Sequence, residues 1–226
     1  MRVADCNWIQ LEEYLEGDDR IVLPLGSTEQ HAYLSLATDN ILAERVAVEA
    51  AEPLGVPVLP VLAYGVTLAF AAYPGSPSLS ADTYVTVLSE LLRSLRRQGF
   101  QRILVVNGHG GNSFAAERVA REGVLWHDWW RSSRVRRVID EIDPEGSHAS
   151  WIENLPWTRL AGVELPEAHK PSVDVSGVLD PGELRRLAGD GSVGGFYERP
   201  DEDVLRMWQA GVEEVRELLE LGWDAA

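Results

Sequence analysis

Uninterrupted apolar runs in this chain end directly in polar, glycine-containing turns. One run predicts a strand at residues 20–25, and another predicts a strand at residues 102–106. Runs without polar alternation are typical of strands that are buried on both faces, as in a parallel sheet. Similar runs predict two more strands, at residues 56–62 and 124–130.

Between these runs the chain shows helical features: apolar positions every three or four residues, with capping residues and glycine or proline at the ends. Helices are predicted at residues 8–16, 39–51, 80–98, 113–122, 181–188 and 200–221, and the start of one more at 147–154. The remainder of 155–200 is rich in proline and glycine and predicts loops. Strands that alternate with helices imply a parallel sheet with right-handed crossovers, which is an α/β fold.

The composition narrows the class of protein. At 226 residues, positions 1–226 most simply form one domain with a substantial core. The 36 acidic and 20 basic residues give a formal net charge of −16, which disfavours a nucleic-acid partner. The single cysteine, Cys6, excludes an internal disulfide, and no signal-peptide pattern is visible, so a cytoplasmic location is expected. Residues 53–81 carry no charge, but prolines interrupt them, so no membrane helix is expected.

The turn after the first strand holds three side chains that suit a metal ion. Glu29 and His31 are two residues apart, so both point to the same side of an extended segment. Asp39 stands where the next helix should begin. Two carboxylates and an imidazole form a mixed nitrogen and oxygen ligand set for a divalent metal. The structural alternative is a solvated Glu29, a hydrogen-bonded His31 and a helix N-cap at Asp39.

A second polar turn, residues 107–112, follows the strand at 102–106 and holds His109 between glycines. The carboxyl ends of parallel strands meet at one edge of the sheet. His109 is therefore expected beside Glu29 and His31, although about 80 positions separate the two turns.

Four patches of sequence occur in an order that matches a known family. They are residues 26–31 with Asp39, residues 65–76, residues 107–112, and residues 148–150 with Glu153. Together they resemble the creatininase (creatinine amidohydrolase) family of metal-dependent amide hydrolases, over most of the chain. The resemblance implies a Rossmann-like three-layer sandwich with a mostly parallel central sheet. It also implies a homohexamer, a small-molecule substrate, and one or two divalent metals per chain, Zn, Mn or Fe.

The resemblance also implies roles for individual residues. The positions of the metal ligands are Glu29, His31, Asp39 and His109. Asp39 would bridge two metals, His148 would act in proton transfer, and Glu153 is the acid of the same catalytic patch. Three positions are predicted to contact substrate, namely Gly110, Phe70 and Trp151.

The chain departs from the family pattern in ways that argue against creatinine as the substrate. Residues 31–35 lack the second histidine that usually follows the first, and Phe70 stands where the second patch usually has a histidine. Creatininase itself has a metal-binding glutamate where this chain has Gly111. Trp151 replaces the glutamate of the usual His-Ala-Gly-Glu patch. The second metal is left with fewer visible ligands, and Glu153 is a candidate for it.

Two functional hypotheses follow. The first is a metal-dependent hydrolase of a non-peptide C–N bond in a cyclic amide, a formamide or a small amide. A metal with an open position lowers the pKa of bound water to about 7, and His148 would protonate the departing nitrogen. The second is a catalytically weakened relative that binds metal or a small ligand as an assembly subunit. A nucleotide-binding Rossmann domain is disfavoured, because no Gly-x-Gly-x-x-Gly follows the first strand.

Overall fold

A three-stranded parallel sheet forms the centre of the molecule in the computed structural model. The structure describes residues 1–121, 123–178 and 180–225. The strands, in spatial order, are β1 (Arg20–Leu25), β2 (Arg102–Asn107) and β3 (Val124–Asp128). The parallel register pairs Leu25 with Asn107 and Asn107 with Asp128, so all three strands end at the same edge. The predicted parallel sheet is confirmed.

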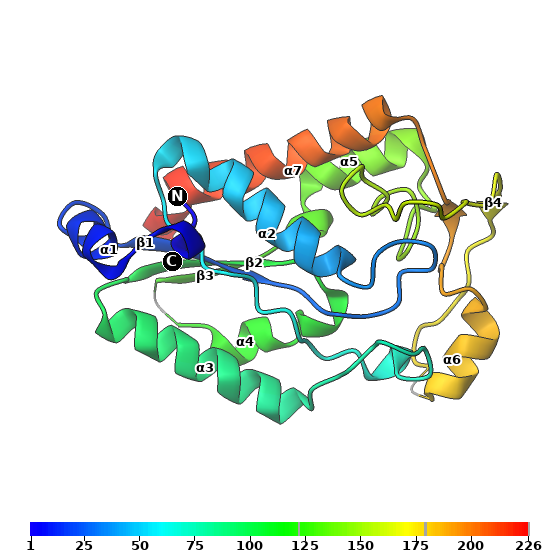
Figure 1. The fold of residues 1–226 in the computed structure, drawn as a ribbon, viewed down its shortest axis with the longest axis horizontal. Coiled ribbons are helices and arrows are strands. Elements are labelled where there is room, and N and C mark those ends of the chain that lie inside the picture. Colours follow the sequence, from blue (N-terminus) through cyan, green and yellow to red (C-terminus); the bar gives the residue numbers. More distant parts are fainter. Residues whose placement is uncertain (122, 179, 226) are drawn as a thin grey trace.

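Helices cover both faces of this sheet (Figure 1), which gives the predicted three-layer α/β architecture. One face carries α2 (Thr38–Ala51), α5 (Ser133–Ile142) and α7 (Asp201–Leu221). The other face carries α3 (Ala81–Arg97) and the short α4 (Ala115–Val119).

The central strand β2 explains why its sequence is continuously apolar. Leu104 and Val106 belong to the hydrophobic core beneath α2, α5 and α7, whereas Ile103 and Val105 belong to the core beneath α3. Successive side chains of a strand point to opposite faces, so a strand between two helical layers has no solvent-facing positions. All four side chains are fully buried.

Smaller elements surround this centre. They include α1 (Trp8–Leu15), α6 (Pro181–Ala188) and an antiparallel pair formed by β4 (His169–Lys170) and β5 (Gly195–Phe196). Single 3-10 turns lie at Val3–Asp5, Glu52–Leu54, Leu68–Phe70, Gly110–Asn112, Trp129–Arg131 and Gly222–Ala225. Figure 1 shows α1 and both labelled termini at one end of the sheet, and α6 and β4 at the other. Among the described helices, none has the length and apolarity needed to span a membrane.

Four predicted elements differ from the structure. The predicted strand at 124–130 ends at Asp128, where a 3-10 turn follows. Residues 56–62 form only isolated bridges, to Arg2 and to β1, because Pro57 and Pro60 have no N–H to donate to a ladder. Residues 147–154 form turns instead of a helix, and α4 is shorter than the predicted 113–122, whose last residue lies outside the described part.

Candidate metal centre

The turns that leave β1 and β2 bring four predicted ligands together inside the protein. The exposed fractions are 1% for Glu29, 0% for His31, 2% for Asp39 and 6% for His109. Asp39 is the second residue of α2, whose N-cap is Ala37 without a side-chain hydrogen bond. The structural alternative is therefore wrong for two of the three residues, since Glu29 is not solvated and Asp39 does not cap the helix. His31 is hydrogen-bonded, as that alternative expected.

Asp39 lies between two groups of potential ligands. Its Oδ2 is 3.0 Å from His109 Nδ1, and the same nitrogen is 3.2 Å from Glu29 Oε1. Its Oδ1 is 3.0 Å from His31 Nε2, which is 3.8 Å from Glu153 Oε2. Each group of three offers donor atoms that lie within 4.8 Å of one another. One carboxylate thus contacts both groups through different oxygens.

The chemistry of these atoms fits divalent metal ions. Glu29 Oε2 and Asp39 Oδ2 are buried and have no partner in hydrogen-bonding geometry among the described residues. Burying a carboxylate oxygen without a partner is unfavourable by about 1–3 kcal/mol or more. Mixed imidazole and carboxylate ligands are typical of Zn and related transition metals. Metal coordination would satisfy Glu29 Oε2, and also Asp39 Oδ2, whose near neighbour His109 Nδ1 is itself a potential ligand.

Backbone carbonyl groups fix which nitrogen of each histidine faces the centre. The carbonyl oxygen of Val66 lies 3.0 Å from His109 Nε2, and that of Glu29 lies 3.1 Å from His31 Nδ1. A carbonyl oxygen can only accept, so these nitrogens carry the protons. His109 Nδ1 and His31 Nε2 are left as the metal-facing atoms, in the arrangement usual for metal-ligating histidines.

Two asparagines that the ligand patterns did not include hold the turns in place. The Asn107 side chain donates to the carbonyl oxygen of His109 (2.8 Å) and accepts from its backbone N–H (3.2 Å). Asn112 donates to the carbonyl oxygen of Gly26 (3.1 Å) and accepts from the Val66 N–H (3.1 Å). Asn112 thereby links its own turn to the loops at Gly26 and Val66. The only sequence signal for this role is the position of both amides at the end of a buried strand.

His148 lies beside the cluster, where the sequence placed it. Its Nδ1 is 3.9 Å from both Glu29 Oε1 and Glu153 Oε2, and the Phe70 ring stacks on its imidazole at 4.6 Å. On the other side, His148 Nε2 is 3.1 Å from the carbonyl oxygen of Gln30 and 2.9 Å from the Gln30 side-chain nitrogen. Burial and the nearby charge of His31 lower the pKa of His148 to about 4.

The pKa values of His31 and Glu153 are also shifted by burial and by neighbouring charges. Burial by itself lowers the pKa of His31, but Asp39 and Glu153 outweigh it and raise the pKa to about 10. Burial raises the pKa of Glu153 to about 7, and the charge of His31 opposes part of that rise. Perturbed ionisable groups gathered in a hollow are typical of functional sites.

A cavity of about 480 Å³ opens onto this cluster. Phe70 and Gly110, two of the predicted substrate contacts, line it. Trp151, the third, does not: its side chain is fully buried in the core beneath α2, α5 and α7. The backbone explains this position, because the Trp151 N–H donates to the carbonyl oxygen of Phe196 and turns the residue away from the cavity.

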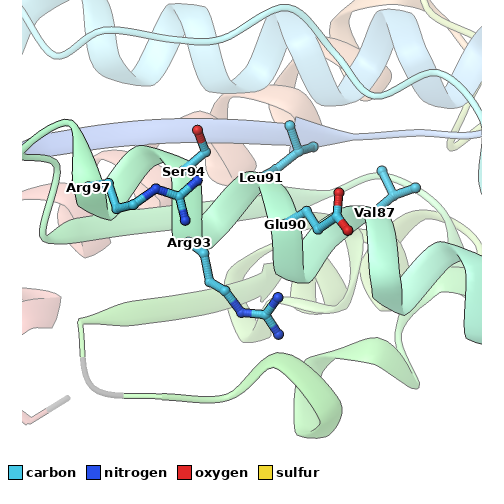
Figure 2. A pocket seen from close by; sticks show the side chains of 6 residues that line it. All are labelled: Val87, Glu90, Leu91, Arg93, Ser94 and Arg97. Atoms are coloured by element: carbon cyan, nitrogen blue, oxygen red, sulfur yellow. The ribbon is translucent and has the colours of Figure 1, made fainter.

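A second hollow, of about 530 Å³, lies along the surface of α3. Figure 2 shows its six lining residues, all of which come from one helix and include Glu90, Arg93 and Arg97. It contains none of the potential metal ligands and lies away from the strand ends. The cavity beside Asp39 is therefore the stronger candidate site.

Comparison with known proteins identifies the family of this chain. The family model described as creatinine amidohydrolase matches residues 4–219. The chain therefore belongs to the creatininase family, whose members are metal-dependent hydrolases of C–N bonds. A crystal structure of creatininase superposes with a TM-score of 0.81 at 22% identity, covering 98% of this chain and 97% of that one. Creatininase structures with a similar fold include a Zn-Zn form and a Mn form.

Relatives with curated names differ in their substrates. The creatinine amidohydrolase of Pseudomonas putida is 29% identical over 164 residues, which are 64% of this chain and 63% of that protein. The mycofactocin precursor peptide peptidase of Mycolicibacterium smegmatis is 38% identical over 57% of this chain and 53% of its own length. That of Mycobacterium ulcerans is 34% identical over 84% of this chain and 86% of its own length. The family is thus shared, whereas the named substrates are not.

Proposed function

We propose that this protein is a metal-dependent amidohydrolase that cleaves a non-peptide C–N bond in a small amide, a cyclic amide or a formamide. The observation that carries the proposal is the position of Asp39 between two ligand groups at the floor of a cavity. Glu29 and His109 complete one group, and His31 and Glu153 complete the other. We propose one divalent ion, Zn, Mn or Fe, in each.

The sequence offered two roles for Glu153, as an acid of the catalytic patch and as a ligand of the second metal, and this proposal adopts the second. Its Oε2 faces His31 and accepts a hydrogen bond of 2.6 Å from the Ala149 N–H. That contact holds the carboxylate toward His31. Glu153 thereby supplies the ligand that Gly111 lacks, and the second group has three protein ligands despite the departures from the family pattern.

Divalent metals held in such sites polarise a carbonyl group and lower the pKa of bound water to about 7. The protein's own residues would position and move the proton. His148 Nδ1 lies 3.9 Å from both Glu29 Oε1 and Glu153 Oε2, so it is placed to take up a proton from attacking water at the ligand groups. Gln30 holds the opposite nitrogen, which keeps the ring oriented while the proton passes to the departing nitrogen. Phe70 covers one face of the ring and excludes water from it.

A peptide C–N bond is a second candidate. The relatives named as peptide peptidases are 34% and 38% identical to this chain, compared with 29% for the creatinine amidohydrolase. The chemistry of the centre is the same for both bonds. Hydrolysis of short peptides compared with lactams and formamides would separate the two candidates.

Metal content and turnover, measured together, test the proposal. Elemental analysis of protein purified without chelator or nickel should give about two divalent ions per chain. Asp39→Ala should lose both ions, whereas Glu153→Gln should lose about one, because it belongs to only one group. Wild-type protein that binds no metal under any reconstitution would refute the enzyme and leave the weakened-scaffold alternative. Bound metal without turnover on any amide would favour a metal-binding assembly subunit.

We also propose that the chain forms a homo-oligomer, as the family resemblance implies. None of the residues of α1 is buried, and Trp8 at its start is 70% exposed. An aromatic side chain that exposed is suited to burial in a subunit interface. Sedimentation of the wild-type chain beside Trp8→Ser would test the proposal.

A further inference from the structure

We propose that the substrate carries a carboxylate group, and that Arg131 and Arg136 bind it at the mouth of the cavity. This inference rests on the proposed amidohydrolase function and adds the chemical class of its substrate. Both arginines line the same cavity as the metal centre. Arg131 ends the turn that follows β3, and Arg136 lies on α5.

Both guanidinium groups have donors left for a ligand. Arg131 makes two loose contacts: its Nη1 is 3.7 Å from Asp128 Oδ2, and its guanidinium carbon is 5.7 Å from the centre of the Trp130 ring. That carboxylate already accepts hydrogen bonds from the side chains of Asn107, Trp126 and Ser113. The Asp128 carboxylate is thus largely satisfied without Arg131.

Arg136 is engaged through only one of its nitrogens. Its Nη2 is 2.5 Å from Asp140 and donates to the carbonyl oxygen of Pro144. Neither contact uses Nη1 or Nε. A guanidinium group binds a carboxylate through pairs of N–H donors, so these free positions match the geometry of that ligand.

The charge of the cavity wall also favours an anionic substrate group. Among the described residues that line it, the only acids are Glu29, Asp39 and Glu153, and all three belong to the metal ligand groups. Outside the centre the charged wall is therefore cationic, in a chain whose net charge is −16. The surrounding negative charge repels free anions in general. Two arginines retained at this mouth favour recognition of one particular anionic group.

The uncharged part of the lining indicates the rest of the substrate. It is largely apolar and includes Trp130, Ile139, Ile152, Val175 and Val193. An amide with a short hydrocarbon body and a carboxylate matches a cavity lined by metal ligands, apolar side chains and two arginines. Two sources have this chemistry: an N-acylated apolar amino acid, and the carboxyl-terminal residue of a short peptide.

Binding of matched neutral and anionic amides to metal-loaded protein tests the inference. Ligand-observed NMR titrations would give Kd values for N-acetyl-L-leucine and N-acetyl-L-leucinamide, which differ in the carboxylate. Glycyl-L-leucine and its amide form a second arm, which distinguishes a peptide from an acylated amino acid. We expect the acid of at least one pair to bind about tenfold more tightly than its amide.

Substitution of the arginines assigns that preference to them. Arg131→Gln combined with Arg136→Gln should bring the acid and the amide to within about twofold. Arg137→Gln is the matched control, because Arg137 is an exposed arginine of α5 that does not line the cavity. Both substituted arginines are also exposed, and circular dichroism would check that the fold is retained.

Two results would overturn the inference. An unchanged preference in the double variant would show that the carboxylate binds elsewhere, for example at the metals. Equal binding of acid and amide by the wild-type protein would show that no carboxylate is selected. The proposed function fails separately: a preference that depends on the arginines, without hydrolysis of any amide, would keep the carboxylate site and reject the hydrolase. Hydrolysis of an amide without tighter binding of the acid would keep the hydrolase and reject the carboxylate site.

Discussion

A side chain at Gly111 should disrupt the metal centre. A Cβ atom built there would lie 2.0 Å from the carbonyl oxygen of Val66 and 2.4 Å from His109 Nε2. Ordinary contacts begin at 3.4 Å. In Gly111→Ala, the carbonyl oxygen of Val66 and His109 Nε2 must therefore each move about 1 Å or more away from the new Cβ atom. The two atoms form the 3.0 Å hydrogen bond that aims His109 Nδ1 at Glu29 and Asp39. Alanine would therefore turn the ring away from the metal position.

The size of the effect follows from this geometry. Loss of an outer hydrogen bond that orients a metal ligand typically lowers metal affinity by about 10- to 100-fold. Overpacking of a tight site costs about 1–3 kcal/mol of stability. Competition with a chromophoric zinc chelator would measure the metal affinity. Urea denaturation of metal-free protein would measure the change in stability.

Gly110 provides the control for this prediction. A Cβ atom at Gly110 would approach no heavy atom more closely than Trp130 Cζ2, at 4.0 Å. Gly110→Ala should therefore leave metal affinity and stability nearly unchanged. Wild-type affinity in Gly111→Ala, or equal damage from both substitutions, would refute the packing argument.

Three further predictions concern different parts of the molecule. His148→Ala should abolish turnover but keep the metal content of the wild type, and unchanged turnover would reject its role in proton transfer. Leu104→Ala should lower the free energy of unfolding by about 2–5 kcal/mol in urea denaturation, since the side chain is fully buried in β2. Burial by itself raises the pKa of Asp18, but hydrogen bonds from Arg20 lower it overall. Asp18→Asn should therefore destabilise the protein at pH 7 by about 1 kcal/mol, and denaturation should show that difference shrinking as the pH falls below about 4.

The sequence predicted those parts of the fold that have their own periodicity. The continuously apolar strands β1 and β2, and the long helices α3 and α7, were located to within one or two residues. The same strands predicted the site, because the turn after each must lie at one edge of a parallel sheet. His31 and His109 therefore meet despite their separation in the sequence.

The helix prediction for residues 147–154 failed because their conformation depends on contacts with residues that are distant in the sequence. Residues 147–154 have helical composition, but the backbone of Trp151 and the side chain of Asn154 bond to the chain at 196–197 instead. Those contacts turn Trp151 into the core and point Glu153 at His31. α5 was not predicted, although its sequence has the helical pattern: Ser132 caps it, and Val135, Ile139 and Ile142 recur at helical spacing. The contacts with residues 196–197, in contrast, have no local pattern that indicates them.

The position of Asp39 between two ligand groups has a consequence for folding. The ligands come from four separate segments: the turns after β1 and β2, the start of α2, and the turns at 147–154. An ion held by all of them would act as a cross-link between parts of the chain that are distant in sequence. A ligand that binds only the folded state adds about 2.7 kcal/mol at a free concentration 100 times its Kd. Metal binding and folding would thus be coupled, so removal of the metal would lower the free energy of unfolding of the whole chain.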